Sequence, residues 1–277
     1  MRQRAAFLAA LSFAFAVPAA AQIPRDSVGA LLDRLRVDPA TTTEADCRAK
    51  IGRAAELNAM GLFHGASVCG AVRMEVESSF LLAAGQIRAM ADMGTMEAAS
   101  ESDQIGPGSL YYLIFFHLGG PGSEDVLRDP AETARLFHLL DDWTAVAGPD
   151  YDPGWPVGRR PEATAYQAAF AASKLHRRRQ LAAMVRAFSD PDYYSLHREF
   201  TALQQRVRVF EQDTPEATRA DDLQRQMGER GRVLGLDFDG DGEPDPVRPP
   251  PSPGEDAGGG EASEPVAEDA VVPGSAR

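Results

Sequence analysis

The chain of 277 residues has only two cysteines, which excludes a small domain held together by a dense set of disulfides. Positive charge is also scarce, since 28 Lys and Arg residues stand against 41 Asp and Glu residues and give a formal net charge of −13. Nucleic acid is therefore disfavoured as a partner, because its binding depends on Lys and Arg neutralising phosphates. The 44% of hydrophobic residues excludes disorder throughout the chain and suits one large or two small globular domains.

Long apolar runs are missing except near the N-terminus, where residues 1–21 have the pattern of a secretory signal peptide. Arg2 and Arg4 precede the apolar residues 5–17, and the small residues Ala19 and Ala21 suit signal peptidase. This run is too short to cross a hydrocarbon core of about 30 Å as a permanent helix, and no later segment is apolar enough to do so. We expect cleavage after Ala21 and a periplasmic or secreted mature protein without a transmembrane segment.

Export changes the interpretation of Cys47 and Cys69, because two cysteines in an oxidising compartment usually pair. A continuous helix between them would separate their Cα atoms by roughly 33 Å, against the roughly 5.5 Å that a disulfide needs. The chain must therefore reverse between them, and Gly61 and Gly65 are the expected points of reversal. The sequence predicts a helical hairpin closed by a disulfide that contributes about 3 kcal/mol.

Helix signals dominate residues 22–236, and strand signals are almost absent. Proline occupies a predicted first helical position in four places, at residues 130, 161, 191 and 215, where its missing N–H costs little. Asp129, Asp190 and Thr214 precede three of these prolines and can cap the free amides. We predict an all-α fold, a helical bundle or a short helix-hairpin array, with helices at roughly 26–37, 43–60, 66–97, 108–118, 131–147, 161–188, 193–210 and 215–234.

The helices predicted at 161–188 and 193–210 have apolar stripes that suit one another. Apolar residues of the second helix advance by threes and fours from Tyr193 to Phe210, which places them on one face. The turn at Ser189 is short, so we expect the two helices to be antiparallel neighbours. Residues 174–179 interrupt the stripe of the first helix, and we expect its middle to face water.

Acidic residues alternate in the segment Asp-Phe-Asp-Gly-Asp-Gly-Glu-Pro-Asp over residues 237–245. Such spacing suits a hard cation, because alternate carboxylates converge where the chain turns at Gly242. The segment resembles the EF-hand loop and, in Asp-Gly-Asp-Gly-x-Pro-Asp, the calcium loops of thrombospondin type 3 repeats. The resemblance implies a Ca²⁺ site, and its candidate ligands are Asp237, Asp239, Asp241, Glu243 and Asp245.

This resemblance covers nine residues and departs from the EF-hand at three points. Arg248 stands where an EF-hand has its bidentate glutamate, Pro244 stands where it has an apolar residue, and a proline run replaces the exiting helix. We therefore expect weak binding, at roughly 0.1 to 1 mM, and the alternative is an acidic turn that ends the last helix. Residues 246–277 contain no aromatic residue and are rich in Pro, Gly and acidic residues, so we expect a disordered tail.

Glu77-Ser78-Ser79-Phe80 resembles the Glu-Ser-x-Phe motif of lysozyme-like lytic transglycosylases, which are exported helical proteins that cleave peptidoglycan. The resemblance implies that Glu77 donates a proton to the glycosidic oxygen. The sequence then departs from the family, because residues 81–87 continue the helix where the family has an Asn-Pro loop. An exposed glutamate on a helix face is the alternative.

The connection over residues 148–160 is rich in Pro and Gly and carries both aromatic and basic residues. Tyr151 and Trp155 with Arg159 and Arg160 suit a glycan or peptide ligand, and long unstructured loops are often functional. The alternative is that Trp155 fills the helical core. Because no catalytic set and no zinc spacing is found, we predict a non-enzymatic interaction protein with an unknown protein or glycan partner, and a Glu77 glycosidase as the alternative.

Overall fold

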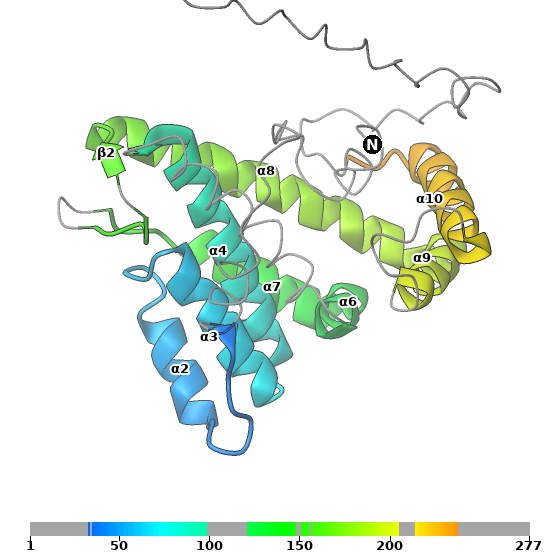
Figure 1. Ribbon diagram of the computed structural model, residues 1–277, viewed down its shortest axis with the longest axis horizontal. Coiled ribbons are helices and arrows are strands. Elements are labelled where there is room, and N and C mark those ends of the chain that lie inside the picture. Colours follow the sequence, from blue (N-terminus) through cyan, green and yellow to red (C-terminus); the bar gives the residue numbers. More distant parts are fainter. Residues whose placement is uncertain are drawn as a thin grey trace, which may run out of the picture. The chain divides into compact units, whose positions relative to one another are not determined.

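The computed structural model describes residues 33, 35–98, 121–147, 151–155, 157–204 and 214–237, and these residues are mostly helical (Figure 1). The predicted all-α fold is confirmed for them. The helices are α2 (Glu44–Gly52), α3 (Ala59–Ala71), α4 (Glu75–Thr95), α6 (Pro121–Arg128), α7 (Pro130–Asp142), α8 (Ala163–Ser189), α9 (Pro191–Gln204) and α10 (Pro215–Val233). Two short strands, β1 (Glu97–Ala98) and β2 (Val157–Arg159), pair antiparallel.

Several predicted features lie outside the described residues. They are the signal peptide at 1–21, the helix at 108–118, most of the calcium loop at 237–245 and the tail at 246–277. Among the helices that are described, none has both the length and the hydropathy needed to cross a membrane.

Capping side chains fix the starts of several helices at the predicted prolines. Asp129 accepts hydrogen bonds from the backbone N–H groups of Ala131 and Glu132 at the start of α7. Thr214 accepts one from Ala217 N–H at the start of α10. Each bond satisfies an amide that has no partner within the helix, so these residues set where the helices begin.

The helices predicted at 43–60 and 66–97 are wrong in their boundaries. α2 ends at Gly52, and α3 begins at Ala59, where Asn58 accepts a hydrogen bond from the backbone N–H of Gly61. α3 ends at Ala71, and Arg73 adopts a positive φ of 59° before α4 begins. The chain therefore reverses at residues 53–58, and the predicted reversal at Gly61 and Gly65 is wrong.

The glycines inside the helices allow close helix packing instead of marking turns. A Cβ at Gly65 of α3 would lie 3.0 Å from Leu81 Cδ1 and 3.3 Å from Lys50 Cβ. A Cβ at Gly85 of α4 would lie 2.6 Å from two ring atoms of Phe63. A glycine at a helix crossing and a glycine at a helix end cannot be told apart by the residue type alone, which explains the wrong prediction.

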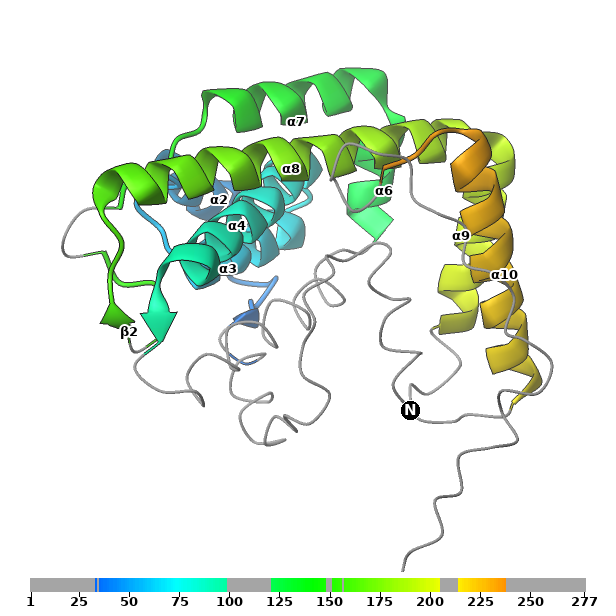
Figure 2. The same ribbon diagram turned by 90° about the horizontal axis from the view of Figure 1, so that it is seen from above.

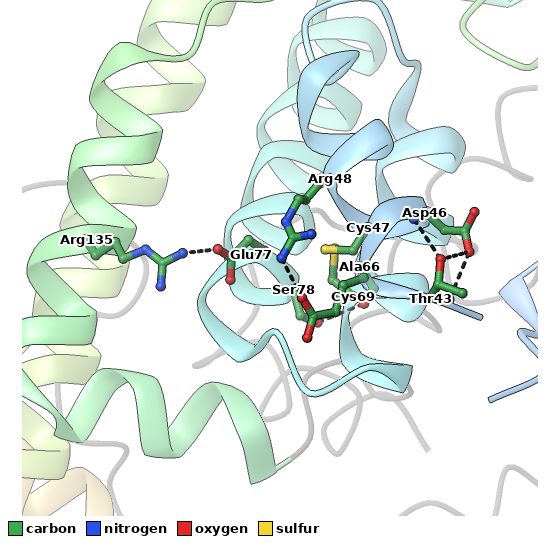
Figure 3. The surroundings of a disulfide bond; sticks show 10 residues. Thr43, Asp46, Cys47, Arg48, Ala66, Cys69, Glu77, Ser78 and Arg135 are labelled. Carbon is green, nitrogen blue, oxygen red and sulfur yellow. Dashed lines mark hydrogen bonds and ion pairs between the residues drawn. A yellow bond between two sulfur atoms is a disulfide. The ribbon is translucent and has the colours of Figure 1, made fainter. Parts of the chain in front are cut away.

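The predicted disulfide between Cys47 of α2 and Cys69 of α3 is confirmed (Figure 3). Both residues are completely buried, and they close the hairpin that α2 and α3 form. At the start of α2, Thr43 and Asp46 form a capping box in which each side chain bonds the other residue's backbone N–H. The covalent bond and the cap thus both hold the N-terminal half of the same short helix.

α4 is the central helix of the described part and packs against α3, α6, α7 and α8 (Figures 1 and 2). Its buried residues combine small alanine and glycine with larger apolar side chains such as leucine and phenylalanine. Trp143, just after α7, is 6% exposed and contacts the rings of Phe80 and Phe170 edge-on at 6.2 and 5.1 Å between centroids. These three aromatic rings join α4, α7 and α8 into one core.

The middle of α8 faces water only in part: Leu175, Arg178 and Arg179 are exposed, whereas three polar residues on the other side of the helix are buried. Ser173, Arg177 and Gln180 lie inside, and Arg177 Nη1 donates to Gln180 Oε1 at 3.1 Å. Lys174 Nζ donates to the backbone carbonyls of Asp141 and Trp143 at 2.8 Å each. The basic residues of α8 therefore bind the C-terminal end of α7, where carbonyl groups lack helical partners.

α9 packs beside α10, and not along α8 as predicted (Figure 2). Asp190, at the junction of α8 and α9, accepts hydrogen bonds from Tyr193 N–H and from two nitrogens of Arg230 on α10. This arrangement holds the pKa of Asp190 well below its ordinary value, at about 2, chiefly through the bond with Arg230. α9 also contacts the end of α8, where the ring of Phe188 packs against those of Tyr194 and His197.

We expect Gly85→Ala to destabilise the protein by about 1 to 3 kcal/mol, because the new methyl group overlaps the Phe63 ring inside the core. Gly94→Ala on the same helix is the matched control, since a Cβ there has no atom within 4 Å. The control should be neutral or stabilising by up to about 1 kcal/mol. Urea unfolding of both variants measures the difference, and equal stabilities would contradict the close helix packing.

Candidate functional site

Two opposite charges are buried on the central helix α4. Arg88 and Asp92 lie one helical turn apart, and neither residue has any exposed surface. Sequence reasoning missed both residues, although an Arg and an Asp four positions apart within an apolar helix are a detectable signal. A buried charge must have partners, because burying it alone costs several kcal/mol.

Asp92 is bonded to two tyrosine hydroxyl groups. Tyr151 donates to Asp92 Oδ2 at 2.6 Å, and Tyr166 of α8 donates to Asp92 Oδ1 at 2.8 Å. The hydroxyl of Tyr151 also accepts a hydrogen bond from Arg88 Nε at 2.9 Å. Arg88, Asp92, Tyr151 and Tyr166 form what we call the buried polar cluster.

The remaining nitrogens of Arg88 bind backbone carbonyls from two other segments. Nη1 donates to Ala55 O at 3.3 Å, in the connection between α2 and α3, and Nη2 donates to Val146 O at 2.6 Å. Val146 N–H donates directly to Ala55 O at 2.9 Å. The guanidinium also lies over the Tyr151 ring, 4.0 Å from its centroid. One side chain therefore joins α4 to two connections that are distant in the sequence, the one between α2 and α3 and the one that follows α7.

Burial dominates the electrostatics of the cluster. Desolvation raises the pKa of the Asp92 carboxyl from its ordinary value of 3.8 to about 6, although both tyrosine bonds and Arg88 act in the opposite direction. The pKa values of Tyr151 and Tyr166 are raised, first by burial and next by the charge of Asp92. Both tyrosines therefore stay protonated and remain donors throughout the physiological range.

The cluster supports a surface segment that we call the display segment, residues 151–155 and 157–160. Its first residue, Tyr151, is buried in the cluster, and Arg160 donates to the Tyr151 carbonyl. Asp152 accepts a hydrogen bond at its carbonyl from Asn58 Nδ2 at 3.1 Å. Gly154 has a φ of 94°, a conformation that favours glycine, and its N–H donates to Asp152 Oδ1.

The far end of the display segment is held by the short β1–β2 pair. Glu97 of β1 is paired in register with Arg159 of β2, and their exposed side chains form an ion pair. Trp155 is half-buried and lies between the two anchored ends. The display segment is thus fixed at both ends, by the buried cluster and by the strand pair.

The structure separates the four residues predicted to bind a ligand. Tyr151 is only 9% exposed, and its hydroxyl is used inside the protein. Trp155, Arg159 and Arg160 are at least partly accessible. Ligand binding by these residues stays a prediction, as does the alternative that Trp155 fills the core, although the tryptophan in the described core is Trp143.

Glu77 lies in the first turn of α4 and is 8% exposed (Figure 3). Its Oε1 is ion-paired with Arg135 Nη2 of α7. The neighbouring Ser79 Oγ lies 3.5 Å from Ser123 Oγ of α6. The glycosidase interpretation stays a prediction, and it gains no partner residue from this arrangement.

Of the five predicted calcium ligands, Asp237 alone lies within the described residues, directly after the end of α10. Gly235 has a φ of 61°, and Leu236 N–H donates to the Gly231 carbonyl. This is the hydrogen-bond pattern that closes helices with a left-handed glycine, and Leu236 is buried after it. Among the described residues there is no group of three or more potential metal ligands.

Comparison of the chain with models of protein families, with curated proteins and with solved structures gives no match.

We expect Arg88→Lys to lower the free energy of unfolding by about 3 to 5 kcal/mol, because one ammonium group cannot reach all the acceptors of the guanidinium. Arg48→Lys is the control, since Arg48 pairs with Glu44 on the surface of α2 and should contribute at most about 1 kcal/mol. Chemical denaturation measures both, and a loss below 1 kcal/mol for Arg88→Lys would contradict its central role.

Proposed function

We propose that the protein is an exported, non-enzymatic interaction protein that uses the display segment to bind a protein or glycan partner. The observation that carries this proposal is the anchoring of an accessible segment by the buried polar cluster. Binding sites work best when a rigid scaffold fixes their geometry, because little conformational freedom is then lost on binding.

The chemistry of the accessible residues suits such a role. Tryptophan and arginine are the residue types that most often dominate binding energy at interfaces. Trp155 and Arg159 provide both types within one segment. Val146, in the neighbouring segment that is bound by the same arginine, leaves 57% of its surface exposed.

The Cys47–Cys69 disulfide supports export, because disulfides persist in oxidising compartments and are rare in the cytosol. Together with the N-terminal sequence pattern, it favours the periplasm or the exterior of the cell. Mass spectrometry of the exported protein tests this part of the proposal through the mass that cleavage after Ala21 predicts.

Weak calcium binding at residues 237–245 is part of the proposal. The support is the alternation of acidic residues in the sequence and the helix termination at Gly235, which gives the loop a defined starting point. A bound cation would neutralise part of the strong negative charge at this end of the chain.

A photoreactive amino acid in place of Glu162, which is exposed two residues after the display segment, should form an adduct with the partner in the native host. The same probe at Glu216, exposed at the start of α10, is the matched control and should give none. Combining the Glu162 probe with Trp155→Ala or Arg159→Ala should reduce the yield at least tenfold.

The adduct is analysed for both protein and glycan mass, so that either partner class is detected. Equal yields from the two probe positions, or a yield that neither Trp155→Ala nor Arg159→Ala changes, would contradict the proposed surface.

Calorimetric titration of calcium into the mature protein should give a Kd of about 0.1 to 1 mM, and Asp239→Ala with Asp241→Ala should abolish the heat. The double variant Glu216→Ala with Asp221→Ala removes the same charge from α10 and should bind calcium as the wild type does. The absence of heat at millimolar calcium in the wild type would reduce the loop to an acidic turn.

A further inference from the structure

A titratable group lies directly beneath the display segment. The carboxyl group of Asp92 is completely buried, and it bonds Tyr151, the residue that begins the segment. Among the described residues no ion pair joins Asp92 to Arg88, because the hydroxyl of Tyr151 lies between them. The negative charge is therefore stabilised by two phenols and by a cation one hydrogen bond away.

We call the display segment docked when Tyr151 is bonded to Asp92 of α4, and undocked when Tyr151 has moved away from α4. Docking of the display segment and ionisation of Asp92 oppose each other. An ionised carboxylate without water or a direct cation carries a large desolvation cost. Because Tyr151 covers Asp92, movement of Tyr151 away from α4 admits water to the carboxylate and removes that cost. A protonated carboxyl gains much less from hydration. Ionisation thus favours the undocked segment, and protonation favours the docked one.

We propose that Asp92 makes the docking of the display segment pH-dependent, so that the segment is held tightly in mildly acidic surroundings and loosens as the pH rises. The inference concerns regulation of the surface in the proposed function and rests on that function for its biological meaning. The linkage between Asp92 and the segment is a property of the protein alone.

The direction and the size of this pH dependence follow from the linkage between docking and proton binding at Asp92. Burial raises the pKa of docked Asp92 to about 6, and hydration in the undocked state returns it toward its ordinary value of 3.8. The docked state therefore binds the proton more tightly, and lowering the pH through 6 favours docking. Between pH 7.5 and pH 5 the docking equilibrium should change by about tenfold.

Other titratable and charged groups also lie near the cluster. The raised pKa values keep Tyr151 and Tyr166 neutral. Two ion pairs lie at the surface near this end of α4, Arg53 with Glu56 and Glu97 with Arg159. Arg160 donates a hydrogen bond to the Tyr151 carbonyl. On α3, His64 is partly buried beside Lys50, and burial followed by the Lys50 charge lowers its pKa.

Hydrogen exchange of the full mature protein tests the proposal through protection factors corrected for the intrinsic effect of pH. The amides of Gly154 and Trp155 should be protected about tenfold more at pH 5 than at pH 7.5. The amides of α10, which do not contact the cluster, provide the internal control. A pH ratio in the display segment equal to that in α10 would overturn the proposal.

Asp92→Asn should remove the pH dependence and keep high protection at both pH values, because the amide is isosteric and stays neutral. Glu97→Gln, at the other anchor of the display segment, is the matched control and should keep the tenfold change. If Asp92→Asn does not fold, the ¹³C carboxyl shift of Asp92 in the wild type decides the matter: a midpoint near 6 supports the proposal, and one below 4.5 overturns it.

These measurements need no partner. Loss of crosslinking at Glu162 with a normal pH response would overturn only the proposed function, whereas a flat pH response with normal crosslinking would overturn only the regulation by Asp92.

Discussion

Burial of the Arg88 guanidinium is the constraint on which much of the described structure depends. A cation without exposed surface must bond several acceptors, and Arg88 obtains them from Ala55, Val146 and Tyr151. These acceptors belong to two connections between helices, the one between α2 and α3 and the one between α7 and α8, and not to helix faces. The guanidinium thereby fixes irregular segments whose carbonyl groups would otherwise need water. Asp92 and Tyr166 complete the cluster by holding the Tyr151 hydroxyl in place.

The position of α4 follows from side-chain size as well as from charge. Glycine and alanine along the helix allow α3 to approach closely, as the contact of Phe63 with Gly85 shows. Close packing excludes water from both faces of α4, and exclusion of water makes the Arg88 and Asp92 bonds strong. The same exclusion raises the pKa of Asp92. Stability and sensitivity to pH therefore have one physical origin in this protein.

Sequence reasoning identified what depends on local chemistry. The helix starts at Asp129 and Thr214 were predictable because a cap and a proline act within one turn. The Cys47–Cys69 pair was predictable because only two cysteines exist. The reversal at residues 53–58 and the partner of α9 were not, since they depend on contacts between distant segments. The roles of Arg88 and Asp92 could not be predicted, because their partners Tyr151 and Tyr166 are distant in the sequence.

The disulfide and the buried polar cluster restrain the protein in different ways. The bond between Cys47 and Cys69 holds α2 to α3 covalently, and protons do not change it. The cluster holds the display segment through hydrogen bonds, one of which ends on an ionisable carboxyl. Restraint of the hairpin is therefore permanent in an oxidising compartment, while restraint of the segment depends on the protonation of Asp92. The restraint that responds to pH is the one beneath the half-buried Trp155.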